Sequence, residues 1–429
     1  MDKHTPELRF PNFNRSWECL SIQKLVDEKV IDKPLDGNHG NIHPISSDFV
    51  EDGIPFVMSN NIQNGIIDFI NSKKITKNQA DKLQKGFSKS GDVLLTHKGS
   101  VGLTAIVPQL EFEYIMLTPQ VTYYRVKNHQ KLDSKFLLHT FNSPQFTKDL
   151  KILADGGTRP YIGITEQRKL LIKLPVIQEQ QKIADFLSSV DNKIRLLTEK
   201  QNSLQRYKKG VMQKLFPSTG SGQVPELRFK DDNGEDFGDW EETNIGKIAD
   251  VKGGKRIPKG FSLQSENSGF PYITVSDMFN HSVDTCKIKY VPKEIENKIS
   301  NYKISVNDIY ISVAGTLGLV GIIPDSLNNA NLTENANKLT NLKCNQRFLL
   351  EYLKSDNFLR LIDSVKTDNA QPKLAIYAIK AFKISLPIKQ EQQKIANFLS
   401  QIDNKIDTVN QQIEQTKTFK KGLLQQMFV

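Results

Sequence analysis

Cysteine is scarce in this chain of 429 residues: Cys19, Cys286 and Cys344 are its only three, and they lie far apart. An odd number at such spacings fits neither a disulfide framework nor a CxxC metal site. No apolar run approaches the roughly 18 residues that a membrane-spanning helix needs. The first residues, MDKHTPELRFPNF, lack the apolar core of a signal peptide. We therefore expect reduced thiols and a cytoplasmic protein.

The sequence also lacks the motifs of common catalytic sites. It has no GxxxxGK[ST] phosphate loop, no HExxH zinc motif, no GxSxG nucleophile elbow and no NPPY-like run of an amino-methyltransferase. A nuclease site could be assembled from Asp284, Glu296 and Lys298. The corresponding stretch of the first half lacks that pattern, however, and three common residues at loose spacing arise often by chance. The sequence thus favours a protein without catalytic residues, metal or cofactor of its own.

The chain is long and carries a large positive charge. A formal net charge of +10 and a pI near 9.2 favour a polyanionic partner, although a solvated basic surface is an equally common reason. A hydrophobic content of 38% is that of a folded protein. A chain of this length is expected to form two or more domains.

One long motif occurs twice. Residues 175–194 read PVIQEQQKIADFLSSVDNKI, and residues 387–406 read PIKQEQQKIANFLSQIDNKI. Fainter matches precede each copy: PELRF at 6–10 and 225–229, and GIPFVMSNNI at 53–62 beside GFPYITVSDM at 269–278. A repeat of this length indicates a tandem duplication, in which the protein makes the same contacts twice.

The repeated motif opens a long helix in each half. Apolar residues recur at alternating spacings of three and four over four or more heptads, which is typical of a coiled coil. The simplest arrangement pairs the two helices within one chain; the alternative is that each packs on its own globule. Polar residues at Gln201, Lys208, Thr416 and Lys420 interrupt the seams, so we expect the packing to loosen toward the C-terminal ends of the helices. The candidates for helix pairing or partner docking are Glu179, Gln180, Ile183, Leu187, Ile194, Glu391, Gln392, Ile395, Leu399 and Ile406.

The rest of each half reads as a mixed globule. Short β-branched runs, such as DVLLT at 92–96 and DIYIS at 308–312, are typical of strands separated by turns. One further helix is expected over 137–151 and one over 348–365. The predicted fold is α+β, with these boundaries: a first globule at 1–173, its long helix at 174–216, a linker at 217–238, a second globule at 239–385 and its helix at 386–429.

Candidate DNA contacts cluster in glycine-rich and basic loops. The glycine pairs at 99–102 and 315–318 either present backbone N–H groups to a phosphate or only turn the chain between strands, and the second is commoner. Basic residues at 252–259 form a loop in the second half. The predicted DNA-binding residues are Lys98, Ser100, Thr158, Arg159, Tyr161, Lys252, Lys255, Arg256, Lys259, Thr316, Gln371 and Lys373.

With these features, the chain resembles the DNA-specificity (S) subunits of type I restriction-modification systems. The resemblance covers nearly the whole chain and depends on Pro-x-x-x-Glu-Gln-Gln-x-Ile-Ala at 175–184 and again at 387–396. Gly-x-Pro at 53–55 and Gly-Asp-Val-Leu at 91–94 add weaker support. The second half departs from the latter, with Asn-Asp-Ile-Tyr at 307–310.

The resemblance implies two target-recognition globules, each reading one part of a bipartite DNA site. It implies that the helices pair as an antiparallel coiled coil with pseudo-two-fold symmetry, which sets the spacing and docks two methyltransferase (M) subunits. S-adenosylmethionine, ATP and Mg²⁺ would be bound by the M subunits and by the restriction (R) subunits, not by this chain. The alternatives are a self-contained DNA methyltransferase or nuclease, which needs a site that the sequence lacks, and a coiled-coil adaptor that binds no DNA.

Overall fold

The computed structural model describes residues 5–63, 65–154, 160–216, 225–279, 281–365 and 373–428. The chain forms two compact units. The first unit comprises residues 1–199 and 411–429, and the second comprises residues 200–410. Each unit therefore contains one globule and a segment of both long helices, α6 (Ile177–Leu215) and α12 (Lys389–Met427).

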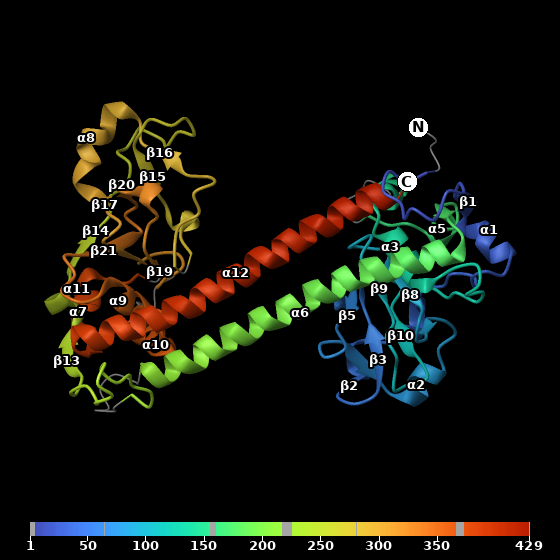
Figure 1. Ribbon diagram of the computed structural model, residues 1–429, viewed down its shortest axis with the longest axis horizontal. Coiled ribbons are helices and arrows are strands. Elements are labelled where there is room, and N and C mark those ends of the chain that lie inside the picture. The colour runs from blue at the N-terminus through green and yellow to red at the C-terminus, as the bar shows by residue number, and fades with distance from the viewer. Residues whose placement is uncertain are drawn as a thin grey trace. The chain divides into compact units, whose positions relative to one another are not determined.

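In the first unit, β-sheets and short helices precede α6 (Figure 1). Three strands pair antiparallel in the order β11-β8-β9, five pair in the order β2-β6-β3-β10-β7, and β1 pairs with β12 directly before α6. Helix α3 packs on β8 and β9. The elements are β1 (Glu18–Ser21), α1 (Ile22–Asp27), β2 (Phe49–Val50), β3 (Ile54–Val57), β4 (Ile62–Gln63), β5 (Ile66–Ile67), β6 (Lys73–Ile75), α2 (Lys77–Asp81), β7 (Phe87–Ser88), β8 (Val93–Thr96), β9 (Thr104–Ile106), β10 (Ile115–Leu117), β11 (Val121–Tyr124), α3 (Ser134–Phe141), α4 (Pro144–Leu153), α5 (Ile164–Gln167) and β12 (Leu171–Leu174).

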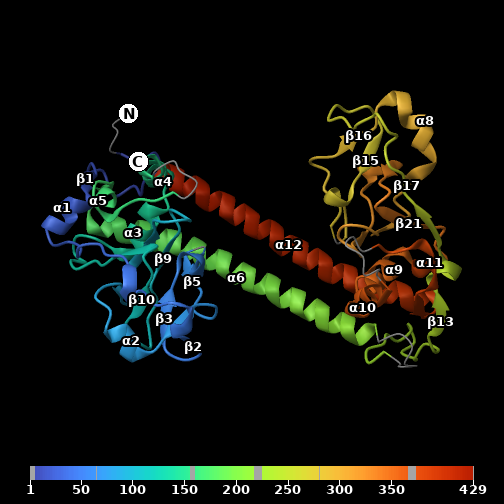
Figure 2. The same ribbon diagram turned by 180° about the vertical axis from the view of Figure 1, so that it is seen from behind.

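The second unit repeats this plan. Its sheets have the orders β14-β21-β18-β19 and β16-β15-β20-β17, and β13 pairs with β22 before α12. In Figure 2, α9, α10 and α11 lie around the first turns of α12, whereas β15, β16 and α8 lie at the other end of the unit. The elements are β13 (Glu241–Asn244), α7 (Ile245–Ile248), β14 (Asp250–Gly253), β15 (Pro271–Ile273), β16 (Lys289–Tyr290), α8 (Glu296–Ile299), β17 (Lys303–Ile304), β18 (Ile309–Ser312), β19 (Val320–Gly321), β20 (Ala330–Leu332), β21 (Ala336–Thr340), α9 (Gln346–Leu353), α10 (Asp356–Val365), α11 (Ile376–Ala381) and β22 (Lys383–Leu386).

The single helix predicted before each long helix is in fact two. In the first unit α3 ends at Phe141, and Ser143 then caps a new helix by accepting a hydrogen bond from the amide of Phe146. Pro144 takes the first position of α4, where its missing N–H costs nothing. Phe141 and Phe146 stack across the break with ring centroids 4.5 Å apart. The break therefore folds α4 back onto the core. Between α9 and α10 a serine takes the same place, since Ser355 accepts a hydrogen bond from the amide of Phe358.

Each unit has a main hydrophobic core that includes both long helices. In the first unit Ile183 and Leu187 of α6 share a buried cluster with Leu423 and Met427 of α12. In the second unit the segments change roles, and Ile395, Leu399 and Ile406 of α12 share a cluster with Val211 and Leu215 of α6. Ile194 is partly buried at the edge of the first cluster. The apolar residues predicted to pair the helices thus lie in cores to which both helices contribute.

The charged ends of the repeated motif contact their own globule. Glu179 is fully buried and pairs with Arg9, from Nε to Oε1 at 2.7 Å. Glu391, equally buried, pairs with Arg228 at 2.8 Å. Both arginines belong to the PELRF repeat, so the two repeated motifs bind each other.

The neighbouring glutamines complete these contacts. Gln180 accepts from the amide of Asp133 and donates to the carbonyl of Pro175. Gln392 does the same with Asn345 and Pro387. Through these contacts the four residues fix each long helix to its globule, and the partner role predicted for them stays a prediction.

Polar pairs fill the places where the seams are interrupted. Gln201 donates to Asn410, and Lys208 donates to Asp403 at 2.7 Å. As residue numbers rise along α6, those of the partners on α12 fall, so these two segments run in opposite directions. Lys420 pairs with Asp191 at 2.5 Å in the first unit. The expected loosening is wrong at Gln201, Lys208 and Lys420, because each has a partner on the other long helix. Thr416 donates instead to the carbonyl of Gln412 in its own helix, so the expectation stays a prediction there.

Within the described residues, the search for a helix both long enough and apolar enough to cross a lipid bilayer finds none.

Candidate nucleic-acid interface

The loops predicted to bind DNA meet at one end of a sheet in the second unit. Strands β14 and β18 both pair antiparallel with β21, so they run parallel to each other and end on the same side. The loops that leave this end are 254–259 after β14, 313–319 after β18 and 333–335 before β21. A β-bridge between Ala314 and Lys373 adds the segment before α11. We call this surface the sheet end of the second unit.

The first unit has the same arrangement. A bridge joins Leu35 to Tyr123 in β11, and β8 pairs with the other side of β11. The loops at this sheet end are 36–39, 97–103 and 118–120. A bridge between Lys98 and Tyr161 adds the segment before α5. Three loops and one bridged segment that are distant in sequence therefore form one surface in each unit.

Hydrogen bonds establish which residues correspond. The amide of His97 donates to the carbonyl of Gln120 at 2.9 Å, and the amide of Val313 donates to that of Asn335 at 2.8 Å. A hydroxyl at the end of β8 or β18 caps the next turn, from Thr96 to the carbonyl of Ser100 and likewise from Ser312 to that of Thr316. The two sheet ends thus have the same backbone arrangement but carry different side chains.

The glycine pairs make turns and do not present their amides outward. Gly99 and Gly102 have φ of +79° and +94°, which favours glycine. Their amides donate to the carbonyls of Pro160 and Thr96, and the amide of Gly318 donates to that of Ser312. The suggestion that these amides bind phosphate is therefore wrong for these three residues, and the commoner interpretation holds.

The side chains predicted to bind DNA are partly brought together. Lys98, Ser100 and Tyr161 lie on the sheet end of the first unit and are exposed. In the second unit the sheet end carries the exposed residues Lys255, Arg256, Lys259, Thr316 and Lys373, and Lys252 is exposed on the adjoining strand β14. Thr158, Arg159 and Gln371 lie outside the described residues. The grouping agrees with a shared surface, and the role of each side chain stays a prediction.

A polar cluster on the first sheet end was not predicted from the sequence. Asp36 is buried, pairs with Lys85, and lies 2.7 Å from Nε2 of His39. Nε2 of His97, fully buried, lies 3.9 Å from the same carboxylate. Burial raises the pKa of Asp36, but the Lys85 and His39 contacts outweigh it and lower the pKa overall. Burial lowers the pKa of His97 to about 4, so this ring is neutral at pH 7.

The second sheet end carries one comparable ion pair. Nε of Arg256 lies 2.5 Å from Oε1 of Glu334, and Arg256 remains 77% exposed while Glu334 is largely covered. The hydrogen bond to Glu334 raises the pKa of Arg256. Burial raises the pKa of Glu334, but the Arg256 contact outweighs it, so that pKa is lowered overall. Only a comparison of the two halves by loop position could have pointed to Glu334 or to His39.

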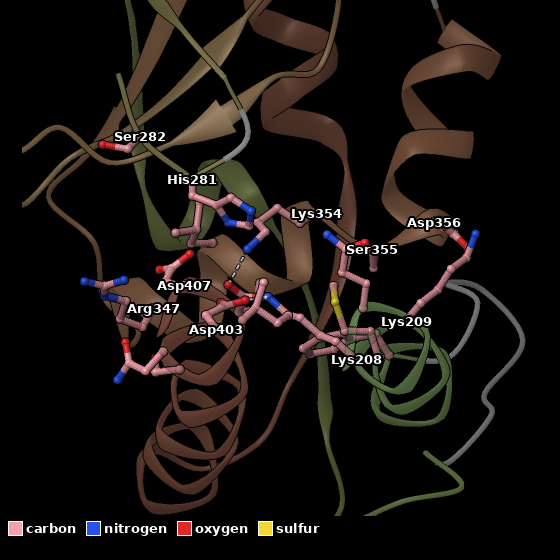
Figure 3. A pocket seen from close by; sticks show the side chains of 18 of the residues that line it. Lys208, Lys209, His281, Ser282, Arg347, Lys354, Ser355, Asp356, Asp403 and Asp407 are labelled. Carbon is pink, nitrogen blue, oxygen red and sulfur yellow. Dashed lines mark hydrogen bonds and ion pairs between the residues drawn. The ribbon is translucent and has the colours of Figure 1, made fainter. Parts of the chain in front are cut away.

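A second charged cluster lines a cavity of about 560 Å³ in the second unit (Figure 3). Lys208 lies 2.7 Å from Asp403 and 2.8 Å from Glu351, and Lys354 lies 2.5 Å from Glu351. Burial raises the pKa of Glu351, but the two ammonium groups outweigh it and lower that pKa overall. Burial lowers the pKa of Lys354 to about 8.

His281, Glu351 and Asp403 come close enough to suggest a cation site. Lys208 and Lys354 already neutralise the two carboxylates, however, so the geometry favours a structural ion cluster. The nuclease residues are not assembled either. Glu296 pairs with Lys303 at 2.6 Å, while the ammonium of Lys298 lies over the ring of Phe261.

Comparison with known proteins agrees with this architecture. The family described as type I restriction modification DNA specificity domain matches residues 44–206 and, a second time, 238–418. A specificity subunit of the type I restriction enzyme MjaVIII from Methanocaldococcus jannaschii is 25% identical over 97% of this chain and 92% of its own length. The EcoKI specificity subunit of Escherichia coli K12 is 23% identical over 85% of this chain and 78% of its own. The crystal structure of an S subunit from M. genitalium, 18% identical, covers 99% of both chains with a TM-score of 0.57.

The fold is thus that of a duplicated protein, whose two halves have the same backbone arrangement but different side chains on their sheet ends. This chain belongs to the type I restriction-modification DNA specificity family, because the family matches both halves and most of the chain. The family resemblance drawn from the sequence is confirmed. So is the role predicted from it, sequence-specific DNA recognition within a restriction-modification complex by a subunit that is not itself the enzyme.

Proposed function

We propose that each unit reads one part of a bipartite DNA site with its sheet end. The observation that carries this proposal is the pair of matching sheet ends with unlike side chains. Two readers on one scaffold suit a target whose phosphate backbone is uniform and whose bases differ between the two parts. Phosphate contacts from lysines would set the register, and contacts to base edges would supply specificity.

The long helices would act as the spacer. Each has 39 residues and would be about 58 Å long at 1.5 Å per residue. Two readers one turn of DNA apart need a separation of roughly 34 Å. The polar pairs described above and the shared hydrophobic cores support an antiparallel coiled coil with pseudo-two-fold symmetry.

The partners we propose are double-stranded DNA and two methyltransferase subunits, one on each repeated helix. Restriction subunits would join through them. The methyltransferase subunits would bind S-adenosylmethionine, and ATP and Mg²⁺ would serve the restriction subunits, so this chain would bind no cofactor. Methylation requires the target base to leave the stack, and the docked methyltransferase would perform that step.

The spacer role is tested by lengthening both helices. A heptad, about 10 Å of helix, is inserted after Leu197 and a matched heptad after Val409. In complex with the cognate methyltransferase, the methylated site should keep its bases and gain a gap longer by roughly 3 base pairs at about 3.4 Å each. A heptad in one helix alone is the control, since it should strain the pairing and reduce activity. An active double insertion with an unchanged gap would rule out the spacer.

A further inference from the structure

Two exposed side chains occupy corresponding places on the two sheet ends. Gly37 and Gly254 mark the place, because a Cβ on either would lie 1.9–2.0 Å from a carbonyl oxygen of the corresponding segments 117–118 and 332–333. His39 and Arg256 each follow that glycine by two residues. Their side chains are 51% and 77% exposed. The same backbone position thus carries the imidazole of His39 in the first unit and the guanidinium of Arg256 in the second.

Both side chains are held by a carboxylate, and the carboxylate comes from a different place in each half. Asp36 holds His39, whereas the second unit has Gly253 at the place of Asp36. Glu334 holds Arg256, whereas the first unit has Pro119 at the place of Glu334. The scaffold itself therefore needs neither carboxylate. Each half has acquired its own means of orienting the side chain at this position.

We propose that His39 and Arg256 are specificity-determining residues that contact base edges in the first and the second part of the site. Asp36 and Glu334 are their positioning residues. This inference rests on the proposed bipartite recognition and assigns it to named side chains. The phosphates of DNA are the same in both parts of the site, so only the bases distinguish them. Side chains that occupy the same place in the two units but differ in chemistry are therefore able to recognise different bases.

The chemistry of each side chain indicates which base it suits. Glu334 accepts from Nε of Arg256, so both terminal amino groups keep their donors for an acceptor pair. O6 and N7 of guanine form such a pair in the major groove. Nε2 of His39 faces Asp36, which leaves Nδ1 for the DNA, and in the tautomer that carries its proton on Nε2 this Nδ1 is an acceptor. An exocyclic amino group of adenine or cytosine fits that acceptor.

The test maps methylation by the complex of this chain with its cognate methyltransferase subunit. Arg256→Ala should lose about 5- to 150-fold discrimination at one base pair of the second part, the range expected for a bidentate contact. The first part should stay unchanged. His39→Ala should relax one base pair of the first part only. His39→Arg, which copies the residue of the second unit, should shift that base pair toward guanine.

Two control variants separate reading from general attachment and from damage to the fold. Lys259→Ala, in the same loop as Arg256, should weaken binding evenly across sequences and lower the slope of log affinity against log salt by about 0.9. Glu334→Ala should relax the same base pair as Arg256→Ala, and the double variant should add nothing further, as expected for residues acting as a unit.

The outcomes also separate this inference from the proposed function. If Arg256→Ala and His39→Ala leave both parts of a bipartite wild-type map unchanged, or weaken all sites equally, the assignment is wrong while bipartite recognition stands. If the wild-type map is not bipartite, the proposed function itself fails. Unfolding of the variants should match the wild type because both side chains are mostly exposed, and a folded variant with an unaltered map overturns the inference.

Discussion

The two units place equivalent lysines against very different surroundings. Lys208 of the second unit is 9% exposed and contacts both Asp403 and the buried Glu351. Lys420 of the first unit is 22% exposed, and among the described residues its ion-pair partner is Asp191 alone. Both pairs join α6 to α12. Beneath them, the first unit has the neutral ring of His139 where the second has Glu351.

The difference teaches which contacts the duplication has preserved. The lysine–aspartate pair between the long helices is kept in both units, as are the buried Arg9–Glu179 and Arg228–Glu391 pairs. The globule residue next to this pair differs in charge, with His139 in the first unit and Glu351 in the second. The helices and their anchors therefore act as the constant part of the molecule, and the globules vary around them.

The largest effect should come from removing the buried lysine. Lys208→Met leaves the buried carboxylate of Glu351 with one ammonium partner instead of two, and we expect a loss on the order of 3 kcal/mol in the free energy of unfolding. Adding Glu351→Gln to Lys208→Met should restore part of the lost free energy of unfolding. Urea unfolding measures this free energy for both variants, and hydrogen exchange of α9 locates the change. A loss as small as that of a surface pair would contradict the buried cluster.

A second effect should appear in acid, and in the first unit. Burial lowers the pKa of His139 to about 3, with the nearby charge of Lys420 adding to the effect. Between pH 6.5 and 3 the unfolded chain binds a proton that the folded chain does not, so stability falls by about 1.4 kcal/mol per pH unit. At pH 5 the loss should be about 2 kcal/mol relative to pH 7.5.

The variant His139→Gln isolates this effect. Its side chain is neutral at both pH values and can still reach Ser188, so this part of the acid sensitivity should disappear. Glu351 should add none over this range, because its lowered pKa delays its protonation until the pH is below about 4.5. Hydrogen exchange of α3 and α9 at pH 7.5 and 5 compares the units. Equal acid sensitivity of wild type and variant would show that the ring is not the cause.

The smallest effect should come from the lysine of the first unit. Lys420→Met removes an ion pair whose aspartate is 40% exposed, and no buried carboxylate is left behind. A loss of about 1 kcal/mol or less is expected, as for surface pairs. Urea unfolding of Lys420→Met and Lys208→Met under identical conditions compares the two losses of unfolding free energy directly. Equal losses would mean that burial does not distinguish the two lysines.

The sequence predicted the regular parts of this molecule well. Heptad periodicity located α6 and α12, and the β-branched runs at 92–96 and 308–312 became β8 and β18. These predictions depend on local patterns that one stretch of chain carries by itself. The breaks between α3 and α4 and between α9 and α10 were missed, although Ser143 followed by Pro144 is a local capping signal.

The sequence could not predict the contacts between distant segments. The PELRF repeat was visible, but nothing in it indicates that its arginine binds the glutamate of the other repeated motif. His39 was passed over because a lone histidine has no motif, and Asp36 lies next to it only through the turn at Gly37. The sheet ends exist because strand order brings three loops together, and strand order is a property of the whole fold.

The most direct test of modular recognition is to exchange one globule. Residues 15–170 are replaced by the corresponding globule of a family member that recognises other DNA, and both long helices are kept. The methylation map of the complex should then change in one part of the site, with the other part and the gap retained. A map in which both parts change together, or in which neither does, would contradict the account that each unit reads its own part of the site.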